Sequence, residues 1–177
     1  MKKTVISLLT LTVIVPSASA VSGPCDIIPA PVRYEILKGE YSPRHDGGDV
    51  HIHLGDKRFI KEINSLNIPE YARDEAYKLT VGKKGIDIFA VSETGVFRAK
   101  TSLKMMLDKD STLTQCSVLD YPRFRHRGLM LDISRNFRDK DFILKQLDAM
   151  ATLKMSTLHL HLTDDAGWRI QIDACPE

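Results

Sequence analysis

Two short apolar runs decide how the second half of this chain folds: Arg127-Gly-Leu-Met-Leu-Asp-Ile-Ser-Arg135 and Leu158-His-Leu-His-Leu-Thr-Asp-Asp165. Each has the length of a β-strand and ends in charged residues, and a helical stretch from residue 139 to about 153 separates them. A strand, a helix and a second strand at this spacing predict two parallel neighbours in one sheet. Polar side chains at the C-terminal ends of both strands are typical of the active-site face of an α/β barrel.

The length of the chain limits how much of such a barrel it holds. The sequence has 177 residues, whereas a complete (β/α)8 TIM barrel needs roughly 250 residues by itself. We therefore expect residues 122–177 to be the first βαβ portion of a truncated barrel. In its helix, Asp139 is a candidate N-cap, the side chains of Ile143, Leu147, Met150 and Ala151 are expected to pack on the sheet, and Lys154 near the C-terminal end suits the helix dipole.

Upstream of this portion, residues 21–121 are predicted to form a small α+β domain, a sheet with two helices. Strand patterns cover residues 32–41, 49–54, 75–81 and 86–91, and the last two are joined by the hairpin turn Gly82-Lys-Lys-Gly85. Asp56 is a candidate cap of the first helix, and the second carries the apolar stripe Val96, Ala99, Leu103, Met106 and Leu107. Pro122 marks the domain boundary, because it restricts the residue before it.

Residues 1–20 have the pattern of a signal peptide. Lys2 and Lys3 form a basic start, an apolar run follows, and Ala18-Ser-Ala20 is a small-residue cleavage site. The apolar run is shorter than the ~20 residues that cross a bilayer. We expect an exported protein, periplasmic or extracellular, with no stable membrane span.

Charge and cysteine content exclude some partners. The chain has 25 basic and 23 acidic side chains, a balance without an electrostatic footprint for nucleic acid. The basic cluster of residues 123–127 is short and poor in aromatic residues, so we expect it to pair at a domain interface or to lie solvated on the surface. Export permits disulfides among Cys25, Cys116 and Cys175, but their pairing cannot be deduced from sequence, and their spacing does not suit zinc.

Three blocks of the second half resemble the opening of the catalytic barrel of family 20 glycoside hydrolases, the β-N-acetylhexosaminidases: Phe124-Arg-His-Arg-Gly-Leu-Met-Leu-Asp-Ile-Ser-Arg135, Met150-Ala-Thr-Leu-Lys-Met155 and His159-Leu-His-Leu-Thr-Asp-Asp-Ala-Gly-Trp-Arg169. Ile28-Pro-Ala-Pro31, Ala76-Tyr-Lys-Leu79 and Gly95-Val-Phe97 resemble the small domain that precedes that barrel. The chain departs from the family pattern at Asn136, Ser156 and Leu160, where the family often has His, Asn and Trp, and it keeps the charged positions.

The resemblance implies an enzyme that cleaves terminal β-linked N-acetylglucosamine or N-acetylgalactosamine from glycans or chitooligosaccharides, with retention. The nucleophile is the 2-acetamido oxygen of the substrate, and no cofactor or metal is needed. The family's catalytic Asp-Glu pair belongs to a later barrel strand. We therefore expect no catalytic pair within this chain, and no hydrolysis by the chain alone.

Arg135 and Asp164 are the main candidate site residues. From the residues alone, Arg135 suits either a guanidinium fork for sugar hydroxyls or a structural ion pair with Asp132 or Asp164. The resemblance matches Arg135 to the arginine that holds hydroxyls of the terminal sugar, and Asp164 to an aspartate that supports a catalytic-site histidine found later in the barrel. His161 and Asp165 are secondary candidates.

Two alternatives to a family 20 enzyme remain. His159 and His161 place both rings on one side of a strand, as metal-dependent barrel hydrolases require, although two or three further ligands would be needed. His51 and His53 repeat this spacing upstream, where nothing nearby completes a coordination set and a solvent-facing or partly covered sheet face is expected. The other alternative is a carbohydrate-binding module without chemistry.

Overall fold

The computed structural model describes residues 27–42, 50–107 and 112–174. The predicted signal peptide, Cys25 and Cys175 lie outside these ranges, whereas Cys116 is buried in the core. Within the described ranges, no helix is long and apolar enough to cross a membrane. We call residues 27–121 the N-terminal unit and residues 122–174 the βαβ unit.

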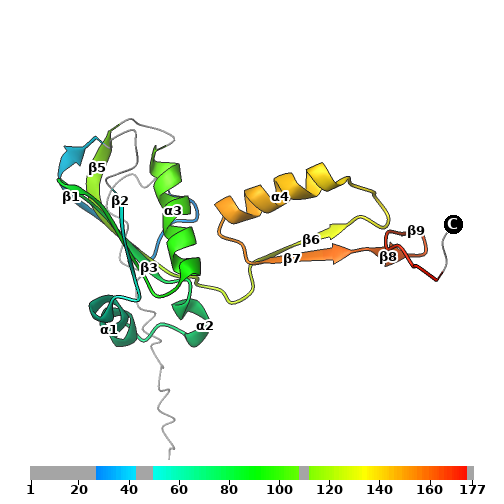
Figure 1. Ribbon diagram of the computed structural model, residues 1–177, viewed down its shortest axis with the longest axis horizontal. Helices are drawn as coiled ribbons and strands as arrows, with labels where there is room; N and C mark the ends of the chain where they lie inside the picture. The colour runs from blue at the N-terminus through cyan, green and yellow to red at the C-terminus, as the bar shows by residue number, and fades with distance from the viewer. Residues whose placement is uncertain (1–26, 43–49, 108–111, 175–177) are drawn as a thin grey trace, which may run out of the picture.

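The N-terminal unit is built on a five-stranded mixed sheet with the strand order β1-β5-β3-β4-β2 (Figure 1). Neighbouring strands are antiparallel except β2 and β4, which are parallel. The predicted strands and the hairpin between β3 and β4 are confirmed, but β5, between β1 and β3, was not predicted. The strands are β1 (Arg33–Tyr41), β2 (Val50–Leu54), β3 (Tyr77–Gly82), β4 (Gly85–Ala90) and β5 (Leu113–Asp120).

The helices of the N-terminal unit are α1 (Lys57–Ser65), α2 (Glu70–Arg73) and α3 (Glu93–Leu107). Helices α1 and α3 are the two that were expected, and the short helix α2 was not predicted. Asp56 caps α1 as predicted, because its carboxylate accepts hydrogen bonds from the Arg58 and Phe59 N–H groups, both at 2.9 Å. Helix α3 packs on the sheet through its predicted apolar stripe, except that Leu107, its last residue, is exposed.

The βαβ unit contains β6 (Gly128–Asp132), α4 (Lys140–Thr152) and β7 (Thr157–His161). Strands β6 and β7 are parallel in a register that runs from Gly128 opposite Thr157 to Asp132 opposite His161, which confirms the predicted strand–helix–strand unit. Asp139 caps α4 by accepting a hydrogen bond from the Phe142 N–H at 2.8 Å. These two strands form a sheet of their own, and the larger barrel stays a prediction.

Helix α4 is less covered than its sequence pattern predicts. Of the expected sheet-packing face only Met150 is buried, and Leu147 is 41% exposed. The physical reason is that two strands offer too narrow a surface to cover the apolar face of a helix. Figure 1 shows α4 over β6 and β7 on one side, with this unit projecting from the N-terminal sheet.

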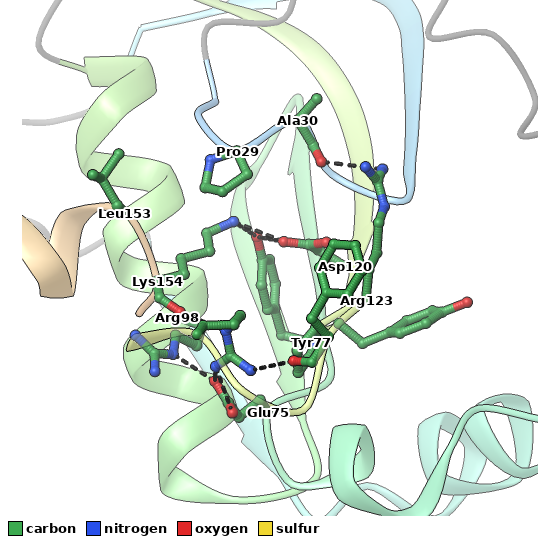
Figure 2. Close-up of a pocket in the computed structure, with 13 residues that line it drawn as sticks. Pro29, Ala30, Glu75, Tyr77, Arg98, Asp120, Arg123, Leu153 and Lys154 are labelled. Carbon is green, nitrogen blue, oxygen red and sulfur yellow. Dashed lines mark hydrogen bonds and ion pairs between the residues drawn. The ribbon is translucent and has the colours of Figure 1, made fainter. Parts of the chain in front are cut away.

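Buried ion pairs join the two units (Figure 2). Glu75 accepts hydrogen bonds from Arg98 Nε at 2.8 Å and Arg127 Nη2 at 2.6 Å. Lys154 Nζ donates to Asp120 Oδ2 at 2.7 Å and to the Tyr77 hydroxyl at 2.9 Å. The basic cluster therefore does pair at an interface, through Arg127. Lys154 does lie just after the C-terminal end of α4, as expected, but its side chain is buried between the units and pairs with a carboxylate there.

Candidate functional site

The C-terminal ends of β6 and β7 place two loops side by side. Asp132 and His161 end the two strands directly opposite each other. Beyond them, the Ile133 and Ser134 N–H groups both donate to the His161 carbonyl oxygen, at 3.2 Å. The chain after β7 forms a small antiparallel hairpin of β8 (Thr163–Asp164) and β9 (Gly167–Trp168). Of residues 168–172, only Trp168 belongs to a strand.

Arg135 lies between two carboxylates, one from each loop. Its Nη1 donates to Asp132 Oδ2 at 2.9 Å, its backbone N–H donates to Asp132 Oδ1 at 3.0 Å, and its Nη2 forms an ion pair with Asp164. The Arg135 side chain is nevertheless 61% exposed. A guanidinium carries five N–H donors, so a side chain held in this way can still donate to a ligand above the strand ends. Both interpretations of Arg135, fork and structural ion pair, are compatible with this arrangement.

Asp164 is the most strongly stabilised carboxylate of the site. His161 Nε2 lies 2.8 Å from Asp164 Oδ2, and the Asp165 N–H donates to Asp164 Oδ1 at 2.8 Å. These hydrogen bonds, His161 first, and the charge of Arg135 lower the pKa of Asp164 to about 2. The Arg135 N–H and guanidinium likewise hold the pKa of Asp132 below its usual value. Both side chains are therefore carboxylates at neutral pH and can only accept hydrogen bonds.

The structure brings together Arg135, Asp164 and His161 of the predicted residues, and Asp165 contributes its backbone N–H. Asp132 belongs to the same cluster. From the sequence it was expected only as a structural partner of Arg135, although its place at the end of β6, three residues before Arg135, was a usable signal.

Neither histidine pair forms a metal centre among the described residues, where no cluster of three or more His, Cys, Asp or Glu side chains could hold a metal ion. His159 is exposed on β7, and the His161 ring contacts Asp164. His53 lies 2.9 Å from Asp87 and stacks on the Phe89 ring, with centroids 4.4 Å apart. The Phe89 ring thus partly covers the sheet face that carries His53, as expected.

Comparison with known protein families assigns both units. The family model for glycosyl hydrolase family 20, domain 2, matches residues 47–121. The model for glycosyl hydrolase family 20, catalytic domain, matches residues 124–177.

Among curated proteins, N,N'-diacetylchitobiase of Vibrio harveyi is 46% identical over 110 residues, which is 61% of this chain and 12% of that protein. β-N-acetylhexosaminidase of Cellulomonas fimi is 34% identical over 158 residues, 85% of this chain and 32% of that protein. The chain thus spans between an eighth and a third of the length of these two relatives.

Solved structures of β-N-acetylhexosaminidases and chitobiases are also similar to this chain. Flavobacterium johnsoniae chitobiase superposes with a TM-score of 0.68 at 28% identity, over 85% of this chain and 29% of that one. Streptomyces plicatus N-acetyl-β-hexosaminidase, in complex with Thio-NAglucal, has a TM-score of 0.65 at 27% identity, over 85% of this chain and 37% of that one.

Proposed function

This chain belongs to glycosyl hydrolase family 20, and from that premise we propose that its protein releases terminal β-linked N-acetylglucosamine or N-acetylgalactosamine from glycans or chitooligosaccharides. The chain's own part in this reaction is to bind the terminal sugar at the ends of β6 and β7. The observation that carries the proposal is the exposed Arg135 guanidinium held between Asp132 and Asp164.

The chemistry of this cluster suits a neutral sugar. Two carboxylates and one guanidinium leave a net negative charge, which disfavours an anionic ligand. A sugar hydroxyl both donates and accepts, so neighbouring hydroxyls can accept from Arg135 and donate to a carboxylate at the same time. Arg135 is therefore proposed to hold hydroxyls of the terminal sugar.

The low pKa of Asp164 determines which role it can have. A general acid of a glycosidase needs a raised pKa, so that it still carries a proton at the working pH. Asp164, with a pKa of about 2, has lost its proton. A permanent carboxylate is instead suited to orient a positively polarised group, and we propose that Asp164 supports a histidine supplied by a later barrel strand.

In the proposed mechanism the 2-acetamido oxygen of the substrate attacks the anomeric carbon, and the leaving group departs with a proton from a general acid. Water then opens the cyclic intermediate, and the configuration is retained. The Asp-Glu pair that would orient the acetamido group and donate the proton is proposed to lie in a later strand of a complete TIM barrel. The mechanism uses no metal or other cofactor.

Kinetics of the protein with a complete barrel would test the proposal. A chromogenic N-acetylglucosaminide should be cleaved, whereas the matching glucoside, which lacks the acetamido nucleophile, should not. Arg135→Ala should raise KM roughly tenfold or more, because hydrogen bonds to a charged donor are each worth ~1.5–3 kcal/mol.

Arg138→Ala is the matched control, since Arg138 lies near the same loop over the Phe142 ring. Its KM should equal that of the wild type. A wild-type KM in Arg135→Ala would refute the assigned role of Arg135, and equal cleavage of the glucoside would refute the acetamido mechanism.

A further inference from the structure

Arg169 follows the β8–β9 hairpin directly and reaches back to the loop that carries Arg135. Its Nε donates to the Ile133 carbonyl oxygen at 3.0 Å, and its Nη2 donates to the Ser134 carbonyl oxygen at 2.9 Å. These two carbonyls belong to the residues immediately before Arg135 in the chain. A single guanidinium therefore donates hydrogen bonds to two consecutive peptide groups of the loop after β6.

Arg169 is itself fixed in place. Its backbone N–H donates to the Leu162 carbonyl oxygen at 3.0 Å, which continues the ladder beyond β9. Its guanidinium lies 5.2 Å from the centre of the Phe137 ring, a favourable cation–π distance. Arg169 thus contacts the loop after β6 on both sides of Arg135.

A second contact holds the hairpin against the same loop. The buried Ser134 hydroxyl donates to the Gly167 carbonyl oxygen at 2.6 Å. A Cβ atom on Gly167 would lie only 2.7 Å from the Ser134 carbonyl oxygen, so a glycine is needed for the backbones to approach this closely. The hairpin and the loop are in direct backbone contact.

We propose that Arg169 is a positioning residue: it sets the loop after β6 against the β8–β9 hairpin and thereby brings the Arg135 guanidinium to Asp164. The inference rests on the proposed function, in which Arg135 holds the terminal sugar. In this proposal Arg169 acts through the backbone of the loop and not by binding the sugar. An arginine is required because its planar fork reaches two carbonyl oxygens at once, whereas the compact ammonium of a lysine cannot reproduce this geometry.

A double-mutant cycle on the protein with a complete barrel tests this inference. Arg169→Met should raise KM for a chromogenic N-acetylglucosaminide roughly tenfold, and Arg169→Lys should restore only part of the loss. In an Arg135→Ala background, Arg169→Met should change KM by less than about twofold, because the residue it positions is already absent.

Arg138→Met is the control, because it removes an arginine from over an aromatic ring without touching the Ile133 and Ser134 carbonyls. An equal increase in KM from Arg169→Met in both backgrounds would show a general structural role and overturn the inference. A wild-type KM in Arg169→Met would overturn it as well, provided that Arg135→Ala raises KM.

Amide hydrogen exchange on the 177-residue chain separates this inference from the proposed function. The Ile133, Ser134 and Arg135 amides are hydrogen-bonded within the site. Arg169→Met should speed exchange at these amides and leave β1–β5 unchanged. If Arg135→Ala leaves KM unchanged but this loop loosens, the sugar-binding role fails while the positioning stands. If exchange in the loop is unaffected, Arg169 does not position it.

Discussion

Replacing Glu75 with glutamine should loosen the βαβ unit from the N-terminal unit. Glu75 is the shared carboxylate of Arg98, on α3, and Arg127, which directly precedes β6. The Glu75 side chain is 16% exposed, and the two arginines are similarly enclosed. Glutamine keeps the size of the side chain but removes its charge, so two enclosed guanidinium groups lose their counter-ion.

The size of the effect follows from this burial. Removing one partner of a buried ion pair costs about 3–5 kcal/mol. Because Glu75 keeps some contact with water and glutamine still accepts a hydrogen bond, we expect about 3 kcal/mol. With a urea m-value of about 2 kcal/mol per molar, the midpoint of unfolding of the βαβ unit should fall by about 1.5 M.

Trp168 makes the assay specific, because it is the single tryptophan of the chain and lies in the βαβ unit. Its fluorescence follows this unit, while far-UV circular dichroism also follows the N-terminal sheet. In Glu75→Gln the fluorescence transition should move to lower urea and precede the dichroism transition. Glu62→Gln, which disrupts the more exposed pair with Lys78, should change stability by less than about 1 kcal/mol. An unchanged fluorescence midpoint in Glu75→Gln, or an equal shift in Glu62→Gln, would refute this reasoning.

Three further predictions concern pH, metal and processing. The pKa of Asp164 is lowered from its ordinary 3.8 to about 2. The stability that this carboxylate contributes to the folded chain is therefore complete above pH 3.8 and is lost as pH falls through about 2. Asp164→Asn should remove this part of the acid dependence of Trp168 fluorescence. Chelator treatment of the complete enzyme should leave hydrolysis unchanged, and a loss rescued by zinc would instead favour metal binding at His159 and His161. Mass spectrometry of protein exported by the expressing cell should find a mature N-terminus at Val21, whereas retention of residues 1–20 would contradict the signal peptide.

Local signals in the sequence determined much of the fold. Asp56 and Asp139 cap their helices through side-chain contacts within three residues, and the turn after Gly82 joins two adjacent strands. Such contacts involve neighbours in the chain and can be predicted without the rest of the molecule. The sequence also offered Arg135 a structural ion pair with Asp132 or Asp164, and both pairs form because the ends of two parallel strands lie together.

Strand β5 was missed because side chains on both of its faces are buried, which hides the usual alternation. It pairs with β1 on one side and β3 on the other, and Gln115, Cys116 and Val118 are all buried. A strand covered in this way shows no clear polar face in its sequence. The expected burial of the α4 face failed for the opposite reason, because Leu147 meets too little sheet.

Only the tertiary structure decided the distant partners of Lys154, Arg127 and Arg169. Lys154 pairs with Asp120, 34 residues away, and Arg127 pairs with Glu75, 52 residues away. The hydrogen bonds from Arg169 to the Ile133 and Ser134 carbonyl oxygens likewise join residues more than 30 positions apart. No local pattern encodes these pairs, because a lysine at the end of a helix or an arginine after a hairpin has the same sequence signature when it faces water. Their partners are set by the packing of separate elements, which brings each charge within reach of enclosed acceptors.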